Sequence, residues 1–233
     1  LDQERRNTGT TWTRNESFEK NGYLVVDNLW DPEELYHPLP KERGQINYQG
    51  SLTEFVHTPV EAQVTGSLAR YSHPMYRQIH SGIRKKLEKH LGRELYNTYY
   101  YDRYYFPGQE LDVHADRDAC EISVTVHIST TLKNSWPIWI KSPDTYTDDT
   151  KKEILVQGES VAVALDPGDG LIYKGCERPH WREPMISEQK IEKKWWWNTV
   201  EDEPPIEEYY HQIFFHYVLA DGQRAHCAWD KAK

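Results

Sequence analysis

Cysteines and long apolar runs are scarce in this chain of 233 residues. Its three cysteines, Cys120, Cys176 and Cys227, are odd in number and widely spaced, and they form no Cys-x-x-Cys pair. This pattern argues against a disulfide framework and against a structural zinc site. No apolar run approaches the roughly 18 residues of a membrane span, and residues 1–15 contain no hydrophobic signal-peptide core. We therefore expect a cytoplasmic protein with reduced thiols and no membrane partner.

The chain also has no internal repeat and no low-complexity linker. Its length is sufficient for one substantial core and short for two. We therefore predict a single domain over residues 1–233.

Positive charge is in the minority, because 28 Lys and Arg against 37 Asp and Glu give a formal net charge of −9. Nucleic acids are bound largely by neutralising their phosphates, so this balance argues against a nucleic-acid partner. Aromatic side chains are abundant, with 9 Trp, 16 Tyr and 5 Phe. Their apolar bodies and polar edges suit the walls of a pocket.

Residues 1–93 have the pattern of a mostly helical N-terminal support region. The segment from Gly22 to Trp30 predicts a short strand, and Asp31-Pro32 directly after it supplies an N-cap and a first helical residue. Between His73 and Leu91 apolar residues recur every four positions, which predicts a longer helix. Gly92 follows it in the position of a C-terminal cap.

Residues 94–228 change to short β segments separated by Pro, Gly and Asp. Many short strands with turn signals between them predict a mainly β fold with flanking helices, built as a sandwich, jelly roll or barrel. The predicted strands are Thr98–Phe106, Leu111–His114, Glu121–Ser129, Pro137–Lys141, Ile154–Val156, Ser160–Leu165, Gly170–Tyr173 and Gln212–Ala220.

The strand EISVTVHIS (121–129) alternates strictly. Its apolar residues from Ile122 to Ile128 share one face, while Ser123, Thr125 and His127 share the other. A barrel with helices outside and a polar lumen explains this pattern, and so does an antiparallel sheet with one wet face.

His114-Ala115-Asp116 is the motif with the clearest chemistry. Residues i and i+2 of a strand project to the same side, so one imidazole and one carboxylate can bind the same metal ion. A second histidine from another strand would complete a facial triad of two histidines and one carboxylate, which suits non-haem iron. Chance alone supplies about two His-x-acid pairs in a chain with 11 His and 37 acidic residues. The assignment therefore depends on its context.

The context is YYYDRYYFPGQELDVHADRDACEISVTVHIS (99–129) together with DPGDGLIYKGCERPHW (166–181). These strings resemble the iron(II)/2-oxoglutarate-dependent dioxygenases, most closely their prolyl 4-hydroxylase-like branch. The family's Tyr-x-x-Gly-Gln…His-x-Asp arrangement is nearly matched by Tyr105 to Asp116, with one extra residue between Tyr and Gly. The resemblance, which spans most of residues 20–220, implies a double-stranded β-helix (a jelly roll, cupin-like) as the core over residues 94–228.

The resemblance implies iron(II) as the metal, with His114, Asp116 and His180 as its ligands, and 2-oxoglutarate and dioxygen as cosubstrates. His180 follows the acidic turn DPGDG, as the distal histidine does in the family. His127 lies on the polar face of its strand and is the best substitute ligand. Ordinary explanations, as helix-surface or strand residues, apply to His80, His90, His211 and His216.

For the far carboxylate of 2-oxoglutarate, the resemblance implies Tyr105 and a basic residue. Tyr105 shares a strand face with Tyr99, Tyr101 and Arg103, which predicts that this face lines the pocket. The family places its Lys or Arg about ten residues beyond the distal histidine. Two alternatives remain: Lys190 has that spacing but lies in a polar stretch, whereas Arg182 lies beside the metal motif and offers a bidentate fork.

Substrate contacts are expected from Arg103 and from the indoles of Trp195, Trp196 and Trp197. The three indoles lie in a segment, 184–209, that would act as a lid at the end of the barrel. The alternative is a long loop fixed by its own tryptophans.

The function that the resemblance implies is hydroxylation of a C–H bond in a small-molecule or peptide substrate, such as a peptidyl proline or a free amino acid. Two other functions remain open. One is a cupin-type metalloenzyme that works without 2-oxoglutarate, and the other is a non-catalytic jelly-roll binding protein.

Overall fold

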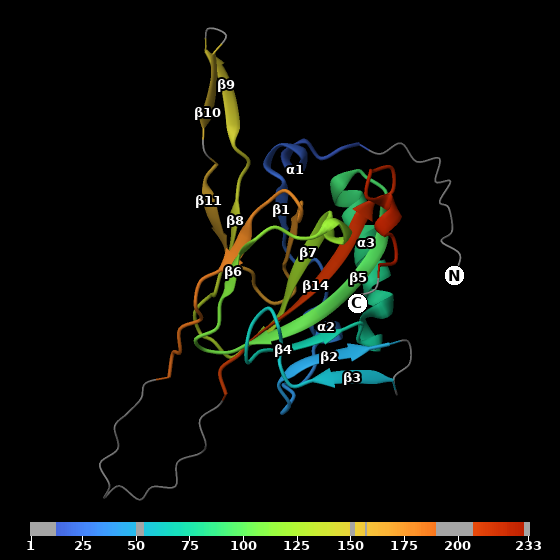
Figure 1. Ribbon diagram of the computed structural model, residues 1–233, viewed down its shortest axis with the longest axis vertical. Coiled ribbons are helices and arrows are strands. Elements are labelled where there is room, and N and C mark those ends of the chain that lie inside the picture. Colours follow the sequence, from blue (N-terminus) through green and yellow to red (C-terminus); the bar gives the residue numbers. More distant parts are fainter. Residues whose placement is uncertain (1–12, 50–53, 150–151, 157, 190–206, 231–233) are drawn as a thin grey trace, which may run out of the picture.

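Two β-sheets form the body of the protein in the computed structural model, which describes residues 13–49, 54–149, 152–156, 158–189 and 207–230 (Figure 1). The larger sheet has eight strands, all antiparallel to their neighbours except the parallel pair β2 and β4. In spatial order its strands are β1 (Tyr23–Val26), β12 (Gly170–Tyr173), β7 (Ile122–Thr130), β14 (Tyr210–Leu219), β5 (Leu95–Tyr105), β4 (Leu68–Tyr71), β2 (Gly44–Tyr48) and β3 (Phe55–Thr58).

The smaller sheet has four antiparallel strands. Their order is β11 (Ser160–Val163), β8 (Ile138–Lys141), β13 (His180–Arg182) and β6 (Leu111–His114). The hairpin of β9 (Thr145–Asp149) and β10 (Lys152–Val156) extends away from the body beyond β8 and β11 (Figure 1). Two sheets of this order, with helices on the outside of one of them, make the predicted double-stranded β-helix, so the expected fold class is confirmed.

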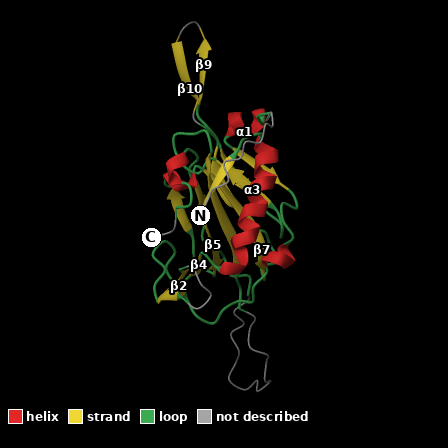
Figure 2. Ribbon diagram, turned by 90° about the vertical axis from the view of Figure 1, so that its right-hand side faces the viewer, coloured by secondary structure: helices red, strands yellow, loops and turns green. Residues whose placement is uncertain are grey.

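The helices cover the outer face of the larger sheet, as Figure 2 shows for α3 (Arg77–Leu91). Ile83, Leu87 and Leu91 of α3 are buried in one cluster with Ile122, Val124 and other outward residues of the sheet. The four-residue spacing of the α3 residues places them on one side of the helix, which is why this helix packs flat on the strands. The shorter helices are α1 (Glu16–Asn21) and α2 (Pro32–Leu35), with 3₁₀ turns at Pro74–Tyr76, Asp118–Cys120 and Ala225–Cys227.

The inner face of the larger sheet is polar and aromatic. Ser123, Thr125 and His127 of β7 are buried between the sheets while the apolar residues of the same strand face the helices. Both faces of β7 are buried, so neither face is exposed to water. The polar lumen that the alternation of this strand predicted is therefore confirmed.

The predicted helical character of residues 1–93 is correct only in part. The predicted helix start at Asp31 and the predicted helix end at Gly92 both hold, because Asp31 caps α2 and the left-handed Gly92 ends α3. However, the region also contributes β1 to β4 to the larger sheet. Strand β4 (LARY) shows no alternating pattern of its own, and β2 (GQINY) alternates over only five residues. β4 is held by pairing with β5 and by a buried ion pair between Arg70 and Asp102, which no local pattern reveals, whereas β2 pairs with β3 and β4.

No helix in the described part of the chain has the length and apolar character required to span a membrane.

Candidate metal centre

The smaller sheet places two histidines side by side. His114 is the last residue of β6 and His180 the first residue of β13, and the two are register partners in this antiparallel pair. Asp116 follows β6 by two residues and is fixed by its backbone N–H, which donates to the carbonyl of Gly175 at 2.8 Å. Strand pairing therefore joins two segments that are more than sixty residues apart.

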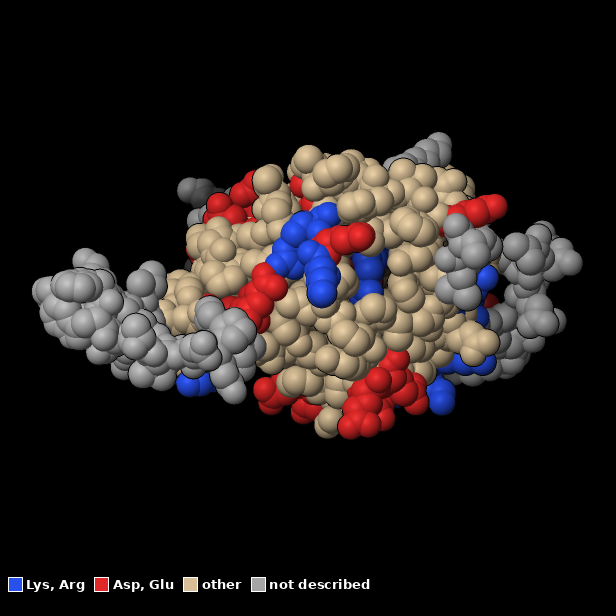
Figure 3. All heavy atoms as spheres, turned by 90° about the horizontal axis from the view of Figure 1, so that it is seen from below, with Lys and Arg blue, Asp and Glu red and all other residues tan. Residues whose placement is uncertain are grey.

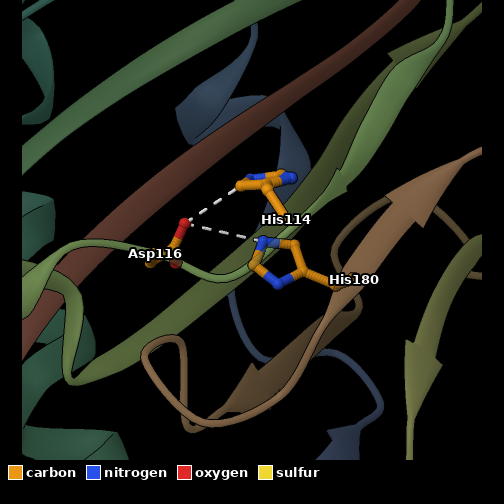
Figure 4. Close-up of side chains that lie close together, drawn as sticks. All are labelled: His114, Asp116 and His180. Atoms are coloured by element: carbon orange, nitrogen blue, oxygen red, sulfur yellow. Dashed lines mark ion pairs between the residues drawn. The ribbon is translucent and has the colours of Figure 1, made fainter.

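The three side chains point at one another (Figure 4). Nε2 of His114 and Nε2 of His180 each lie 3.6 Å from Oδ1 of Asp116. The two imidazole centroids are 4.3 Å apart, and one ligand atom from each residue lies within 4.8 Å of the others.

Both imidazoles are oriented by backbone carbonyls. Nδ1 of His114 lies 2.7 Å from the carbonyl of Asp112, and Nδ1 of His180 lies 3.0 Å from that of Arg178. A carbonyl oxygen only accepts hydrogen bonds, so Nδ1 carries the proton and Nε2 of each neutral ring presents a lone pair. Burial lowers the pKa of His180, and the nearby Asp116 opposes this shift only in part, so this ring is neutral at pH 7.

Two lone pairs and one carboxylate oxygen therefore face a common point with no hydrogen-bond donor among them. Such an arrangement needs a cation, and two imidazole nitrogens with one carboxylate form the facial donor set that suits iron(II). The side chain of His180 is 2% exposed, whereas that of His114 is 27% exposed. The centre is therefore closed on the side of His180 and open on the side of His114.

His127, the substitute ligand in the sequence prediction, lies elsewhere in the lumen. Its ring stacks on Tyr210 at 4.2 Å, and its Nδ1 lies 2.7 Å from the carbonyl of Leu165. Within the described residues, His127 belongs to neither of the two groups of side chains that could hold an ion.

Arg182 lies two residues beyond His180 on β13 and is buried between the sheets. Its guanidinium donates to the carbonyl of Trp136, to Oε1 of Gln212 at 2.5 Å and to the hydroxyl of Tyr210 at 3.4 Å. It also lies 4.6 Å from the ring centroid of Trp136 and 4.5 Å from that of Tyr210. Arg182 is thus a rigidly held cation in the lumen.

Two buried donors, one on this cation and one on its neighbour Gln212, have no hydrogen-bond partner in the part of the chain that the structure describes. They are Nε of Arg182 and Nε2 of Gln212. Buried donors are usually satisfied, so this pair fits an acceptor group such as a carboxylate of a bound molecule.

Tyr105 reaches the same part of the lumen from β5. Its ring packs against Trp136 with centroids 5.1 Å apart, and its hydroxyl accepts a hydrogen bond of 3.3 Å from Arg103. Arg103 is also fully buried, and its guanidinium binds Glu61 at 3.1 Å and Gln63 at 2.8 Å. The predicted sharing of one strand face by Arg103 and Tyr105 is confirmed by this contact, while a contact of Arg103 with substrate stays a prediction.

Lys190 and the three tryptophans Trp195, Trp196 and Trp197 lie outside the described residues. The basic alternative at Lys190 and the lid therefore stay predictions.

Three neighbours of Arg182 were not expected from the sequence, namely Trp136, Tyr210 and Gln212. The predicted last strand began at Gln212, but β14 starts at Tyr210. Alternation along β14 would have placed Tyr210 and Gln212 on the inner face, yet nothing local indicates that they contact Arg182.

Comparison with known proteins supports the fold. An oxidoreductase of the 2OG-Fe(II) oxygenase family from Burkholderia pseudomallei matches with a TM-score of 0.51 and 11% identity, over 95% of this chain and 98% of that chain. The non-haem α-ketoglutarate-dependent epimerase SnoN from nogalamycin biosynthesis matches with a TM-score of 0.51 and 12% identity, over 87% of this chain and 80% of that chain. A Pseudomonas putida prolyl-4-hydroxylase is also similar, with a TM-score of 0.47 and 11% identity, over 86% of this chain and 95% of that chain.

Neither a scan against protein-family models nor a search of curated proteins finds a match. At these identities the structural similarities concern the fold. The chain has the fold of the iron(II)/2-oxoglutarate-dependent oxygenases, so the resemblance that its motifs suggested is confirmed at that level.

Proposed function

We propose that this protein is an oxygenase that depends on iron(II) and 2-oxoglutarate. The observation that carries the proposal is the meeting of His114, Asp116 and His180 inside this fold, with both Nε2 lone pairs directed at Oδ1 of the carboxylate. Their donor set and their fixed tautomers suit iron(II), and three ligands leave positions open for a cosubstrate and dioxygen.

Arg182 is the residue that we assign to the far carboxylate of 2-oxoglutarate. It lies two residues beyond His180 on the same strand, so both side chains face the lumen. Its unpartnered Nε and the unpartnered amide of Gln212 offer hydrogen bonds to a carboxylate. Tyr105 and Tyr210, which pack on Trp136 beside it, close this end of the site.

With iron(II) bound, the centre would supply the redox chemistry that couples oxidative decarboxylation of 2-oxoglutarate to oxidation of a substrate C–H bond. The residues of the chain hold and orient the reactants. His114 leaves the centre open on its side, which is where we expect the substrate to approach.

The reaction that we propose is hydroxylation of a prolyl residue in a peptide or of a free amino acid. This choice depends on the prolyl 4-hydroxylase-like motif at Tyr105 to Asp116. The similar fold of SnoN, an epimerase, makes product analysis necessary, because one fold supports several outcomes.

A nucleic-acid substrate is disfavoured by the net charge of −9. Figure 3 shows one face of the molecule, on which Lys and Arg occur in small groups beside Asp and Glu rather than in one broad basic patch.

An anaerobic titration with iron(II) in the presence of 2-oxoglutarate tests the metal centre. We expect a weak visible charge-transfer band in the wild type and its loss in Asp116→Ala and His180→Ala. The exposed-site variant His226→Ala is the control and should retain the band. A band that persists without Asp116 or His180 but disappears in His127→Gln would refute the assignment of the ligands.

Succinate formation during turnover separates the proposed reaction from its alternatives. A cupin-type enzyme that works without 2-oxoglutarate would bind iron and release no succinate. A non-catalytic binding protein would give neither the band nor succinate.

A further inference from the structure

The second carboxylate oxygen of Asp116 is held on the side away from the histidines. Oδ1 faces His114 and His180, whereas Oδ2 lies 3.0 Å from the hydroxyl of Ser123 on β7. That hydroxyl in turn lies 2.9 Å from Nδ1 of His216 on β14. A chain of polar atoms therefore links the larger sheet to the proposed ligand.

The protons of this chain can be assigned from its donors and acceptors. Ser123 has one hydroxyl proton, and the carboxylate of Asp116 is a stronger acceptor than the carbonyl of Cys120, which lies 3.2 Å away. The hydroxyl therefore donates to Oδ2. Nδ1 of His216 must then carry the proton and donate to the oxygen of Ser123.

Both supporting side chains are rigidly packed. Ser123 is fully buried and His216 is 2% exposed. The ring of His216 lies against Tyr99, with centroids 4.5 Å apart, and its centroid is 5.8 Å from that of Tyr101 and 6.5 Å from that of Phe214.

Gly175 also approaches Oδ2 of this carboxylate closely. A Cβ atom at this position would lie 2.5 Å from Oδ2 of Asp116 and 2.3 Å from the carbonyl of Cys120. Oδ2 is thus held by Ser123 and packed closely against a backbone that tolerates no side chain.

We propose that His216 and Ser123 are positioning residues that fix Asp116 so that only Oδ1 is presented to the metal. This inference depends on the proposed metal centre. It also accounts for the second group of possible ligands, Asp116, Cys120 and His216. In that group Ser123 bridges Oδ2 of Asp116 and Nδ1 of His216, and the sulfur of Cys120 is 3.2 Å from the hydroxyl of Tyr99. Hydrogen bonds therefore already occupy these atoms, whereas Nε2 of His216 has no partner among the described residues.

The test is cobalt(II) binding to the metal-free protein, followed by titration and by the visible spectrum at saturation. Loss of an outer partner of a metal ligand typically costs 10–100-fold in metal affinity. We expect a weakening of about that size for Ser123→Ala, with a changed cobalt(II) band at saturation. Thr125→Val is the matched control, because Thr125 is the next inward residue of β7, is fully buried and has an unpartnered hydroxyl among the described residues. It should keep wild-type affinity.

A second pair of variants keeps the test decisive if Ser123→Ala does not fold. His216→Asn retains an N–H near the position of Nδ1, whereas His216→Leu removes it. We expect the asparagine variant to bind cobalt(II) about tenfold more tightly than the leucine variant.

Wild-type affinity and spectrum in Ser123→Ala would overturn the positioning role and leave the metal centre intact. An equal loss of cobalt(II) affinity in Thr125→Val would also overturn the positioning role. Equal cobalt(II) affinity of the two His216 variants would overturn it as well. Absence of cobalt(II) binding by the wild type would overturn both this inference and the proposed function.

Discussion

At the scale of single residues, Arg182 is the cation that we propose for 2-oxoglutarate. Arg182 is buried, faces the lumen next to His180, and is fixed by Trp136 and Gln212. A cation held in this way has no freedom left to lose on binding, which favours recognition of a carboxylate.

Replacing Arg182 should therefore affect the binding of the cosubstrate most strongly. We expect Arg182→Lys to raise the KM for 2-oxoglutarate at least tenfold, because lysine keeps the charge but loses the planar fork. Steady-state kinetics at saturating substrate and iron measure this. A rise in KM with Lys190→Ala, and none with Arg182→Lys, would show that the assignment is wrong.

The sequence predicts the residues of the candidate site unevenly. His114 and Asp116 follow from their two-residue spacing and from the motif around them, and His180 from its place after the DPGDG turn. The polar inner face of β7 follows from alternation, which includes Ser123. The partners of Arg182 do not follow, because their meeting depends on the register of β14 and on the packing of one sheet over the other.

At the scale of elements, the C-terminus of α3 requires a glycine at position 92 for two reasons, its backbone conformation and its close packing. Gly92 has a φ of +64°, and its N–H donates to the carbonyl of Glu88 at 2.9 Å. A Cβ atom there would lie 1.7 Å from the carbonyl of Thr13, so the preceding segment of the chain packs directly on this cap.

A pair of alanine substitutions separates the cost of the left-handed backbone from the cost of the close packing. Gly108 also has a positive φ, +85°, but a Cβ atom there would meet nothing within 4 Å. Gly108→Ala should lower the free energy of unfolding by about 1 kcal/mol, the cost of the left-handed backbone. Gly92→Ala should lower it by a further 1–3 kcal/mol or so because of the clash. Urea unfolding measures both, and equal losses would show that the contact with Thr13 yields at no cost.

Elements with a clear local pattern were predicted well and elements held by pairing were not. β6 and β12 have the predicted bounds, since turn residues flank them on both sides. β13 has only three residues, too few for any periodicity, and is defined by its neighbours β6 and β8. β4 is likewise stabilised by β5, which follows α3 in the sequence.

At the scale of the whole molecule, the two sheets enclose a lumen that contains buried histidine and tyrosine side chains, among them His127, His216, Tyr105 and Tyr210. The jelly roll as such was predicted from its many short strands and the family resemblance. The order of the strands was not, because it depends on pairings between segments that can be a hundred residues apart, such as β5 with β14. That order brings polar side chains from several strands into one interior.

The buried histidines should make the metal-free protein sensitive to acid. Burial lowers the pKa of His80 to about 3 and those of His127, His211 and His216 to about 4, against about 6.5 in an unfolded chain. Between pH 6.5 and 4 the unfolded chain therefore binds more protons than the folded one, so stability is fully present above pH 6.5 or so and falls below it. Each group contributes a slope of about 1.4 kcal/mol per pH unit in this window.

Within about two pH units, four such groups together lower the free energy of unfolding by as much as a domain usually has. We therefore expect the metal-free protein to unfold near pH 5. Urea unfolding at a series of pH values, with a chelator present, measures the slope. His80 packs among Tyr100, Phe215 and Tyr217, so His80→Phe should fit there and reduce the slope by about one proton. The same change at the exposed His226 should leave the slope as in the wild type. A free energy of unfolding that stays constant from pH 7 to 4.5 or so would contradict the idea that these histidines fold in their neutral form.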